Sequence, residues 1–146
     1  MSVDAFAIYQ LAAQGFCCSQ ILVQLGLGED SNPALLRAAN GLCGGMGRSG
    51  KTCGALTGGV CLIGLKAGKG TPTEMAHPKL NTMINELLEW FEQEYKTLDC
   101  AGIIDVSLDS GNEYPVKCGS IVSDTYLKVM QILADNHDAD EDEEED

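Results

Sequence analysis

Long hydrophobic runs are missing from this sequence of 146 residues. The longest apolar stretch, residues 55–65, is interrupted by three glycines and a threonine, whereas a membrane-spanning helix needs about 20 apolar residues. Residues 1–6 contain no Lys or Arg, and no apolar segment with a small-residue cleavage site follows, so the pattern of a secretory signal is also missing. We therefore expect a cytoplasmic protein without membrane insertion.

Basic residues are scarce, with nine Lys and Arg against 22 Asp and Glu and a formal net charge of -13. Nine of the acids lie in the last twelve residues, and the rest of the chain carries a charge of only -4. No basic stripe is present to neutralise phosphates, so we expect no nucleic acid partner. The acidic segment has no apolar residue after Ala139, and we expect residues 135–146 to form a disordered tail on a single domain, residues 1–134.

A C-x-x-C motif is also absent, although the chain contains seven cysteines. This excludes a thioredoxin-type motif, a zinc-ribbon knuckle and C-x-x-C-H haem attachment. Because stable structural disulfides are not expected in a cytoplasmic protein, so many cysteines indicate a metal, cluster or redox role. His77 and His137 have no evident partner, so a Ser-His or Cys-His hydrolytic site is not supported. The cysteines are Cys17, Cys18, Cys43, Cys53, Cys61, Cys100 and Cys118.

No segment has the pattern of a convincing strand, and apolar residues recur at helical spacing. We predict an all-α bundle of about five helices, over residues 4–25, 34–40, 52–66, 71–95 and 117–134. A glycine-rich loop, with six glycines in residues 41–54, precedes the third of these helices, which is apolar nearly all round and therefore expected to be central and buried. Gly54 and Gly58 lie four residues apart, a spacing that suits close contact with a neighbouring helix.

The glycine-rich loop also contains a nucleotide-binding motif in an unsuitable context. Residues 45–52 match G-x-x-x-x-G-K-[ST], the phosphate-binding loop of nucleotide hydrolases, with Lys51 in the lysine position. That loop functions between a buried strand and a helix, but residues 35–44 predict no strand. Binding of ATP or GTP is therefore the least favoured of three functional hypotheses.

Cys53 is the cysteine best placed for chemistry. It is predicted in the first turn of the central helix, beside Lys51 and near Arg48, where the helix dipole and positive charge favour the reactive thiolate. Cys61 lies inside the same apolar helix and is expected to pack rather than react. Cys17 and Cys18 are adjacent, so on a helix they point about 100° apart and at most one of them is expected to be functional.

Four short segments of the chain resemble one protein family. The first is a CGAxxG sequence, Cys53-Gly54-Ala55-Leu56-Thr57-Gly58. The second, residues 15–20 (GFCCSQ), looks like a first cysteine segment with Cys18 in the family position. The third, residues 44–47, reads Gly-Gly-Met-Gly. Cys100 and Cys118 correspond to two later cysteines. Over roughly residues 5–134 the chain therefore resembles the small proteins of the C_GCAxxG_C_C family.

The resemblance implies a redox role for one site built from the four family cysteines, Cys18, Cys53, Cys100 and Cys118. These either cycle between dithiol and disulfide or ligate a [2Fe-2S] cluster, with Gly44, Gly45, Gly47 and Gly54 beside the sulfurs. A related domain occurs in split-Soret cytochromes, which carry an iron–sulfur centre besides haem. Zinc in the same thiolate site is the alternative from a different class. Cys17, Cys43 and Cys61 are additions to the pattern, of which Cys43 is a fifth candidate. The expected partner is another redox protein, and the chain could also form a homodimer. The resemblance does not decide whether the protein is an oxidoreductase or an electron carrier.

Overall fold

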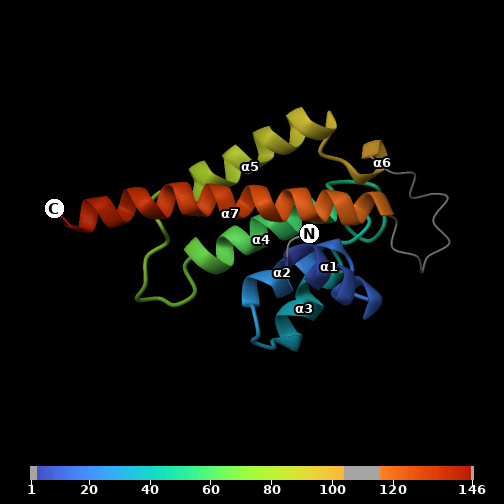
Figure 1. Ribbon diagram of the computed structural model, residues 1–146, viewed down its shortest axis with the longest axis horizontal. Coiled ribbons are helices and arrows are strands. Elements are labelled where there is room, and N and C mark those ends of the chain that lie inside the picture. The colour runs from blue at the N-terminus through green and yellow to red at the C-terminus, as the bar shows by residue number, and fades with distance from the viewer. Residues whose placement is uncertain (1–2, 104–115, 146) are drawn as a thin grey trace.

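The computed structural model describes residues 3–103 and 116–145, with side chains for residues 5–103 and 119–136. These ranges contain helices and connecting loops but no strand (Figure 1). The helices are α1 (Val3–Ala13), α2 (Cys18–Leu27), α3 (Pro33–Asn40), α4 (Gly54–Ala67), α5 (Leu80–Tyr95), α6 (Cys100–Ile103) and α7 (Val116–Glu145). The all-α class predicted from the sequence is therefore confirmed, with seven helices in these ranges where about five were predicted for the chain.

The first predicted helix is divided in two by a turn at residues 14–17. Gly15 has a φ of 95°, a left-handed conformation that favours glycine and that a continuous helix cannot contain. Cys17 then adopts an extended conformation as the N-cap of α2, and its N–H donates to Gln20 Oε1 at 3.2 Å. The turn therefore places Cys17 at a helix N-terminus rather than inside a helix.

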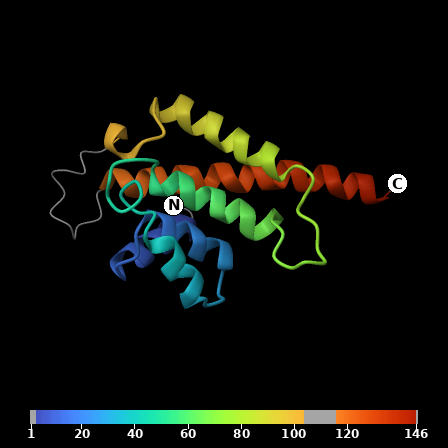
Figure 2. The ribbon, with the colours of Figure 1, turned by 180° about the vertical axis from the view of Figure 1, so that it is seen from behind.

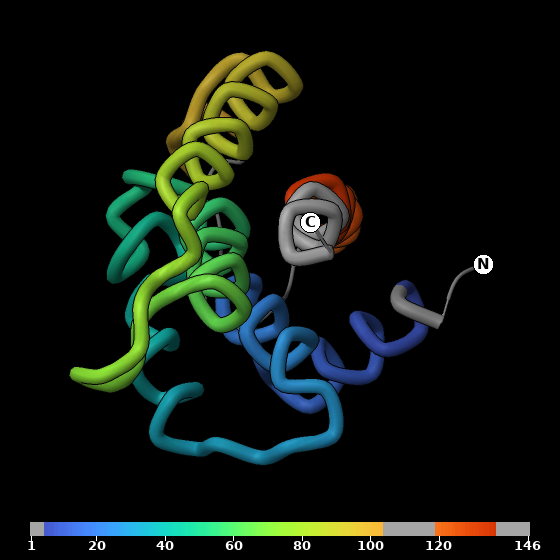
Figure 3. Tube along the Cα trace, turned by 90° about the vertical axis from the view of Figure 1, so that its left-hand side faces the viewer, coloured from blue at the N-terminus to red at the C-terminus, as the bar shows by residue number. Residues whose placement is uncertain are grey.

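Helix α7 runs along the long axis of the molecule, with the other long helices beside it (Figures 1 and 2). It packs against α1, α2, α4 and α5, and the end-on view shows these helices arranged around one side of it (Figure 3). Helix α3 packs against α2. Helix α4 contacts α2, α5 and α7, as expected for a central helix.

Glycines on α4 allow it to approach α2 closely. A Cβ on Gly58 would lie 2.8 Å from Ser19 Cα and 3.0 Å from the Ser19 carbonyl oxygen, so only glycine fits without a shift. On another face, a Cβ on Gly59 would lie 3.0 Å from both Leu87 and Thr125. The spacing of Gly54 and Gly58 thus marks a real helix contact, as the sequence indicates.

The core is formed by aliphatic side chains and one phenylalanine from the packed faces of α2, α4, α5 and α7. The largest of the fully buried residues are Ile21, Leu22, Val23, Leu56, Leu62, Ile63, Met83, Leu87, Phe91, Val122, Val129 and Ile132. Burial of such surface supplies the main driving force for folding. Within the described ranges, no helix combines the length and apolar character required to cross a bilayer.

Two helix boundaries differ from those predicted. Helix α5 begins at Leu80 rather than near residue 71, because the Glu74 carboxylate accepts the N–H groups of Gly70 and Thr71 and forms a separate turn. Helix α7 continues to Glu145, beyond the predicted end at Ala134, so its backbone includes most of the acidic segment. The side chains of that segment after Asn136 lie outside the described part.

Candidate functional site

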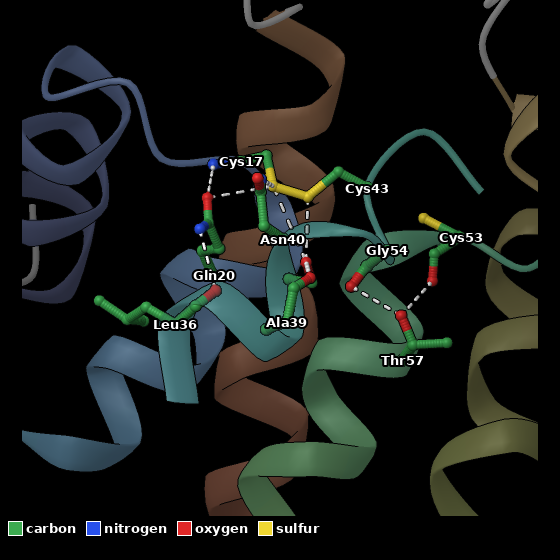
Figure 4. Close-up of a disulfide and its surroundings, with 10 residues drawn as sticks. Cys17, Gln20, Leu36, Ala39, Asn40, Cys43, Cys53, Gly54 and Thr57 are labelled. Carbon is green, nitrogen blue, oxygen red and sulfur yellow. Dashed lines mark hydrogen bonds between the residues drawn. A yellow bond between two sulfur atoms is a disulfide. The ribbon is translucent and has the colours of Figure 1, made fainter. Parts of the chain in front are cut away.

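Cys17 and Cys43 form a disulfide that joins the N-terminus of α2 to the loop after α3 (Figure 4). Their Cα atoms are 6.1 Å apart and the two residues are separated by 26 positions in the sequence. Both side chains are half-buried, so solvent reaches this part of the molecule. The pair thus has the connectivity and the access that thiol–disulfide exchange requires.

Polar side chains from α2 and α3 surround this disulfide. Asn40 Nδ2 donates to Cys17 Sγ at 3.7 Å, and Ser19 Oγ lies 3.0 Å from Cys43 Sγ (Figure 4). Ser19 Oγ also donates to the Ala39 carbonyl at 2.7 Å. Ser19 Oγ is also 3.8 Å from Cys17 Sγ, so this hydroxyl lies beside both sulfurs of the pair.

Gln20 fixes the position of Cys17 relative to α3. Its Oε1 accepts the Cys17 N–H, and its Nε2 donates to the Leu36 carbonyl at 3.0 Å (Figure 4). Gln20 and its hydrogen bond to Leu36 are buried, so this bond is shielded from water and holds the first turn of α2 against α3.

Three of the four family cysteines gather at the N-terminal end of α4. Cys53 is the N-cap of α4, and a Cβ on the next residue, Gly54, would lie 2.5 Å from Cys18 Sγ. Cys18, Cys53 and Cys100 are buried, with exposed fractions of 8%, 7% and 5%. The structure places Cys118 in the first turn of α7, with its side chain outside the described residues.

Backbone hydrogen bonds bring the segments of Cys53 and Cys100 together. The Cys53 N–H donates to the Leu98 carbonyl at 2.8 Å, and the Cys100 N–H donates to the Lys51 carbonyl at 2.6 Å. An isolated antiparallel bridge between Thr52 and Asp99 lies between these two bonds. The CGAxxG motif and the start of α6 are therefore adjacent, although they are far apart in sequence.

The described cysteines do not form a metal-ligating group. Among the side chains given for residues 5–103 and 119–136, no three of His, Cys, Asp and Glu lie together as possible ligands. The thiols of Cys18, Cys53 and Cys100 are the donor type that iron–sulfur clusters and zinc use, and the side chain of the fourth family cysteine, Cys118, lies outside the described residues. We therefore derive no step through a cluster or a zinc ion.

Burial raises the pKa of the Cys53 thiol above its ordinary value, and this outweighs the lowering effect of the N–H groups of Ala55 and Leu56. Burial also raises the pKa of Tyr95, and a charge on Cys53 raises it further. The Tyr95 hydroxyl donates to Asp124 Oδ2 at 3.1 Å. Burial therefore opposes the activation predicted for Cys53, because the sequence pattern shows the helix N-terminus but not the burial.

We expect alkylation of Cys53 to follow this raised pKa. Because burial raises the pKa of this thiol, we expect native Cys53 to become reactive only at a higher pH than an ordinary cysteine. Iodoacetamide at pH 8 should label it at least about tenfold more slowly in the native protein than in urea. Peptide mass spectrometry measures both rates, and faster labelling in the native protein would contradict the burial of this thiol.

The glycine-rich loop is closed by its own backbone. Five successive residues, 44–48, have φ values between 61° and 76°, which is a left-handed turn that glycine tolerates best. The N–H groups of residues 46–51 all donate to carbonyl oxygens of residues 41–46. These N–H groups, that of Gly47 among them, are thus not available to a phosphate or to the sulfurs, whereas the N–H groups of Gly44 and Gly45 do not belong to this set.

The nucleotide-binding motif lacks its structural context. The segment before the loop is helix α3 and not a strand, whereas a phosphate-binding loop needs a strand on that side. Lys51 donates its own N–H to the Gly45 carbonyl at 3.1 Å, within the closed loop. The structure therefore offers no phosphate cradle at residues 45–52.

Cys61 has a packing role, as expected from the sequence. It lies on α4 against a small cluster formed by Val23, Leu36 and Ala39. Burial raises its pKa above the ordinary value, which keeps it protonated at neutral pH. Cys61 is for this reason a suitable control position in tests of the other cysteines.

Sequence reasoning missed the Cys17–Cys43 pair. Both cysteines were additions to the family pattern, and stable disulfides were not expected for a protein of this kind. Their pairing depends on α3 folding back onto α2, which no local spacing reveals. The one available signal was Gly15, whose left-handed conformation ends α1 and exposes Cys17 at the start of the next helix.

Comparison with known protein families gives a match over most of the chain. The model of a family described as "Putative redox-active protein (C_GCAxxG_C_C)" matches residues 16–132. The matched range includes the Cys17–Cys43 pair as well as Cys18, Cys53, Cys100 and Cys118. No curated protein and no solved structure matches the sequence.

Proposed function

Because the chain belongs to the C_GCAxxG_C_C family, we propose that it is a thiol–disulfide redox protein in which Cys17 and Cys43 cycle between disulfide and dithiol. The observation that carries this proposal is the disulfide between two half-buried cysteines. The three family cysteines with described side chains are buried, so a partner reaches the Cys17–Cys43 pair first. Under this proposal, the electrons are carried by the thiols of Cys17 and Cys43.

The surroundings of the pair favour Cys17 as the cysteine that leaves as a thiolate. It caps α2, where the helix dipole stabilises negative charge. Asn40 donates to the same sulfur. A lower thiol pKa makes a better leaving group, so we expect a partner to attack Cys43.

The exchange transfers two electrons from a dithiol of a partner protein. A partner thiolate attacks Cys43 Sγ, the bond to Cys17 breaks, and Cys17 leaves as a thiolate that takes up a proton. The second partner thiol, after losing its proton, attacks the mixed disulfide and releases Cys43, which is then protonated. The partner ends as a disulfide, and Cys17 and Cys43 both end as thiols.

Thiol counting before and after reduction tests the proposal. We expect air-oxidised protein to gain two thiols per chain with dithiothreitol, because one disulfide is reduced. The Cys43→Ser variant should gain none, whereas Cys61→Ser should still gain two because Cys61 only packs. Equal gains in all three proteins would show that Cys43 is not part of the reducible bond.

The family resemblance supplies a second candidate, a [2Fe-2S] cluster on Cys18, Cys53, Cys100 and Cys118, with zinc as its colourless alternative. Its support is the gathering of three of these cysteines at the N-terminal end of α4. Anaerobic purification followed by a visible spectrum and by iron, sulfide and zinc analysis decides between the candidates. Thiol–disulfide cycling alone predicts a colourless protein without stoichiometric metal, and equal amounts of iron and sulfide would establish the cluster instead.

A further inference from the structure

We infer that Cys18 is a third cysteine of the redox site, which takes over the bond to Cys43 when Cys17 leaves. The inference rests on the proposed cycling of Cys17 and Cys43 and adds an internal step to it. It concerns the contact between the start of α2, the loop after α3 and the first residue of α4. Cys18 would thus connect the accessible disulfide to the buried family cysteines.

The position of Gly54 shows how close Cys18 and Cys43 are. A Cβ on Gly54 would lie 2.5 Å from Cys18 Sγ and 3.4 Å from Cys43 Cα. Because both distances start from one point, Cys18 Sγ lies within about 6 Å of Cys43 Cα, and Figure 4 shows Gly54 near Cys43. Rotation of the Cys43 side chain is then enough to bring its sulfur toward Cys18.

The backbone around this contact is held in place from both sides. Ser19, the residue after Cys18, packs its Cα against Gly58 of α4 and donates its hydroxyl to the Ala39 carbonyl. Gln20 ties the same turn to α3. Because the two segments are fixed, the thiol of Cys18 stays at a high effective concentration relative to Cys43.

The exchange step is balanced without an external oxidant. Cys18 loses its proton and its thiolate attacks Cys43 Sγ, so a Cys18–Cys43 bond forms while the Cys17–Cys43 bond breaks. Cys17 leaves as a thiolate at the N-terminus of α2, where Asn40 donates to it, and takes up a proton. Cys17 and Cys18 point in different directions, but they bond to Cys43 in turn and not at the same time.

The exchange changes what a partner encounters. Before it, the disulfide joins two half-buried cysteines, and after it, the disulfide contains the buried Cys18 and the accessible thiol is Cys17. The new bond also lies beside Gly54, next in sequence to Cys53. Cys18 therefore offers a route by which oxidation at the surface reaches the CGAxxG motif.

Peptide mapping of the full-length chain tests this step. Trypsin cleaves after Arg37 and Arg48, so Cys17 and Cys18 fall in peptide 1–37 and Cys43 falls alone in peptide 38–48. Cys53 and Cys61 share peptide 52–66. In the wild type a link between peptides 1–37 and 38–48 does not tell the two adjacent cysteines apart, whereas single variants do.

The Cys17→Ser variant is oxidised with glutathione disulfide and digested without reduction. We expect peptide 1–37 linked to 38–48 through Cys18, in about tenfold excess over the glutathione adduct of Cys43, because the neighbouring thiol outcompetes a second glutathione. Cys43 found as its adduct, or linked to peptide 52–66, would overturn the inference. A far-ultraviolet spectrum equal to that of the wild type verifies that the variant folds.

The reciprocal variant separates this inference from the proposed function. Cys18→Ser should still link peptides 1–37 and 38–48, now through Cys17, and Cys61→Ser should behave as the wild type. If Cys18→Ser links the peptides and Cys17→Ser does not, the Cys17–Cys43 couple stands and the role of Cys18 is refuted. If neither variant nor the wild type links them, the proposed function itself fails.

Discussion

Reduction of the Cys17–Cys43 disulfide should lower the free energy of unfolding by about 3 kcal/mol, because the bond closes a loop between residues 26 positions apart and limits the entropy of the unfolded chain. The melting temperature should fall by about 10 °C for a domain of this size. Thermal and urea unfolding with and without dithiothreitol measures both changes. This is the larger of the two stability effects that we expect.

The matched control for this experiment is the Cys43→Ser variant, which has no disulfide in this position to reduce. Dithiothreitol should leave its melting temperature unchanged, and the variant should unfold at a temperature near that of the reduced wild type. If the reductant destabilised wild type and variant equally, the stabilising bond would lie elsewhere in the chain. If it destabilised neither, residues 17 and 43 would not be linked in the folded protein.

Replacing Gly58 with alanine should destabilise the protein by about 2 kcal/mol, because the new Cβ meets the backbone of Ser19 rather than a movable side chain. The helices α2 and α4 must separate to make room for it. Since Ser19 also contacts Cys43 Sγ and the Ala39 carbonyl, the shift reaches the redox pair. Urea denaturation, analysed for the midpoint and the slope, gives the change in free energy.

Gly64→Ala is the matched control on the same helix. A Cβ on Gly64 meets nothing within 4 Å, so alanine there should stabilise α4 by about 0.5 to 1 kcal/mol through the lower entropy of the unfolded chain. The two substitutions thus add the same methyl group with opposite expected signs. Equal effects at both positions would mean that α2 and α4 do not pack through Gly58.

The parts of the fold that follow from local sequence patterns were predictable. Apolar residues at helical spacing indicate the all-α class, and Gly54 and Gly58 indicate a close helix contact. The division of the first helix was not predicted, because a single Gly15 is tolerated within a helical pattern and only tertiary packing decides that it ends the helix. The start of α5 was misplaced for a different, local reason, since Glu74 hydrogen-bonds to Thr71 instead of opening a helix.

The site was harder to predict than the fold. The motif identified the end of α4 where Cys18, Cys53 and Cys100 gather, but neither their burial nor its effect on the pKa of Cys53 is visible in the sequence. The pairing of Cys17 with Cys43 needs the hydrogen bonds from Ser19 and Gln20 that hold α3 against α2. Contacts of this kind join residues distant in sequence and become apparent only in the folded chain.

An equilibrium redox titration tests the central claim most directly. The wild-type protein is equilibrated in glutathione buffers of increasing oxidised fraction, quenched with acid, alkylated and mapped by mass spectrometry. We expect one reversible two-electron transition in which peptides 1–37 and 38–48 become linked, with Cys61 alkylated throughout. If all cysteines stay reduced at every buffer ratio, the redox site at Cys17 and Cys43 is contradicted. The same holds if the transition is confined to peptides 52–66, 97–117 or 118–128.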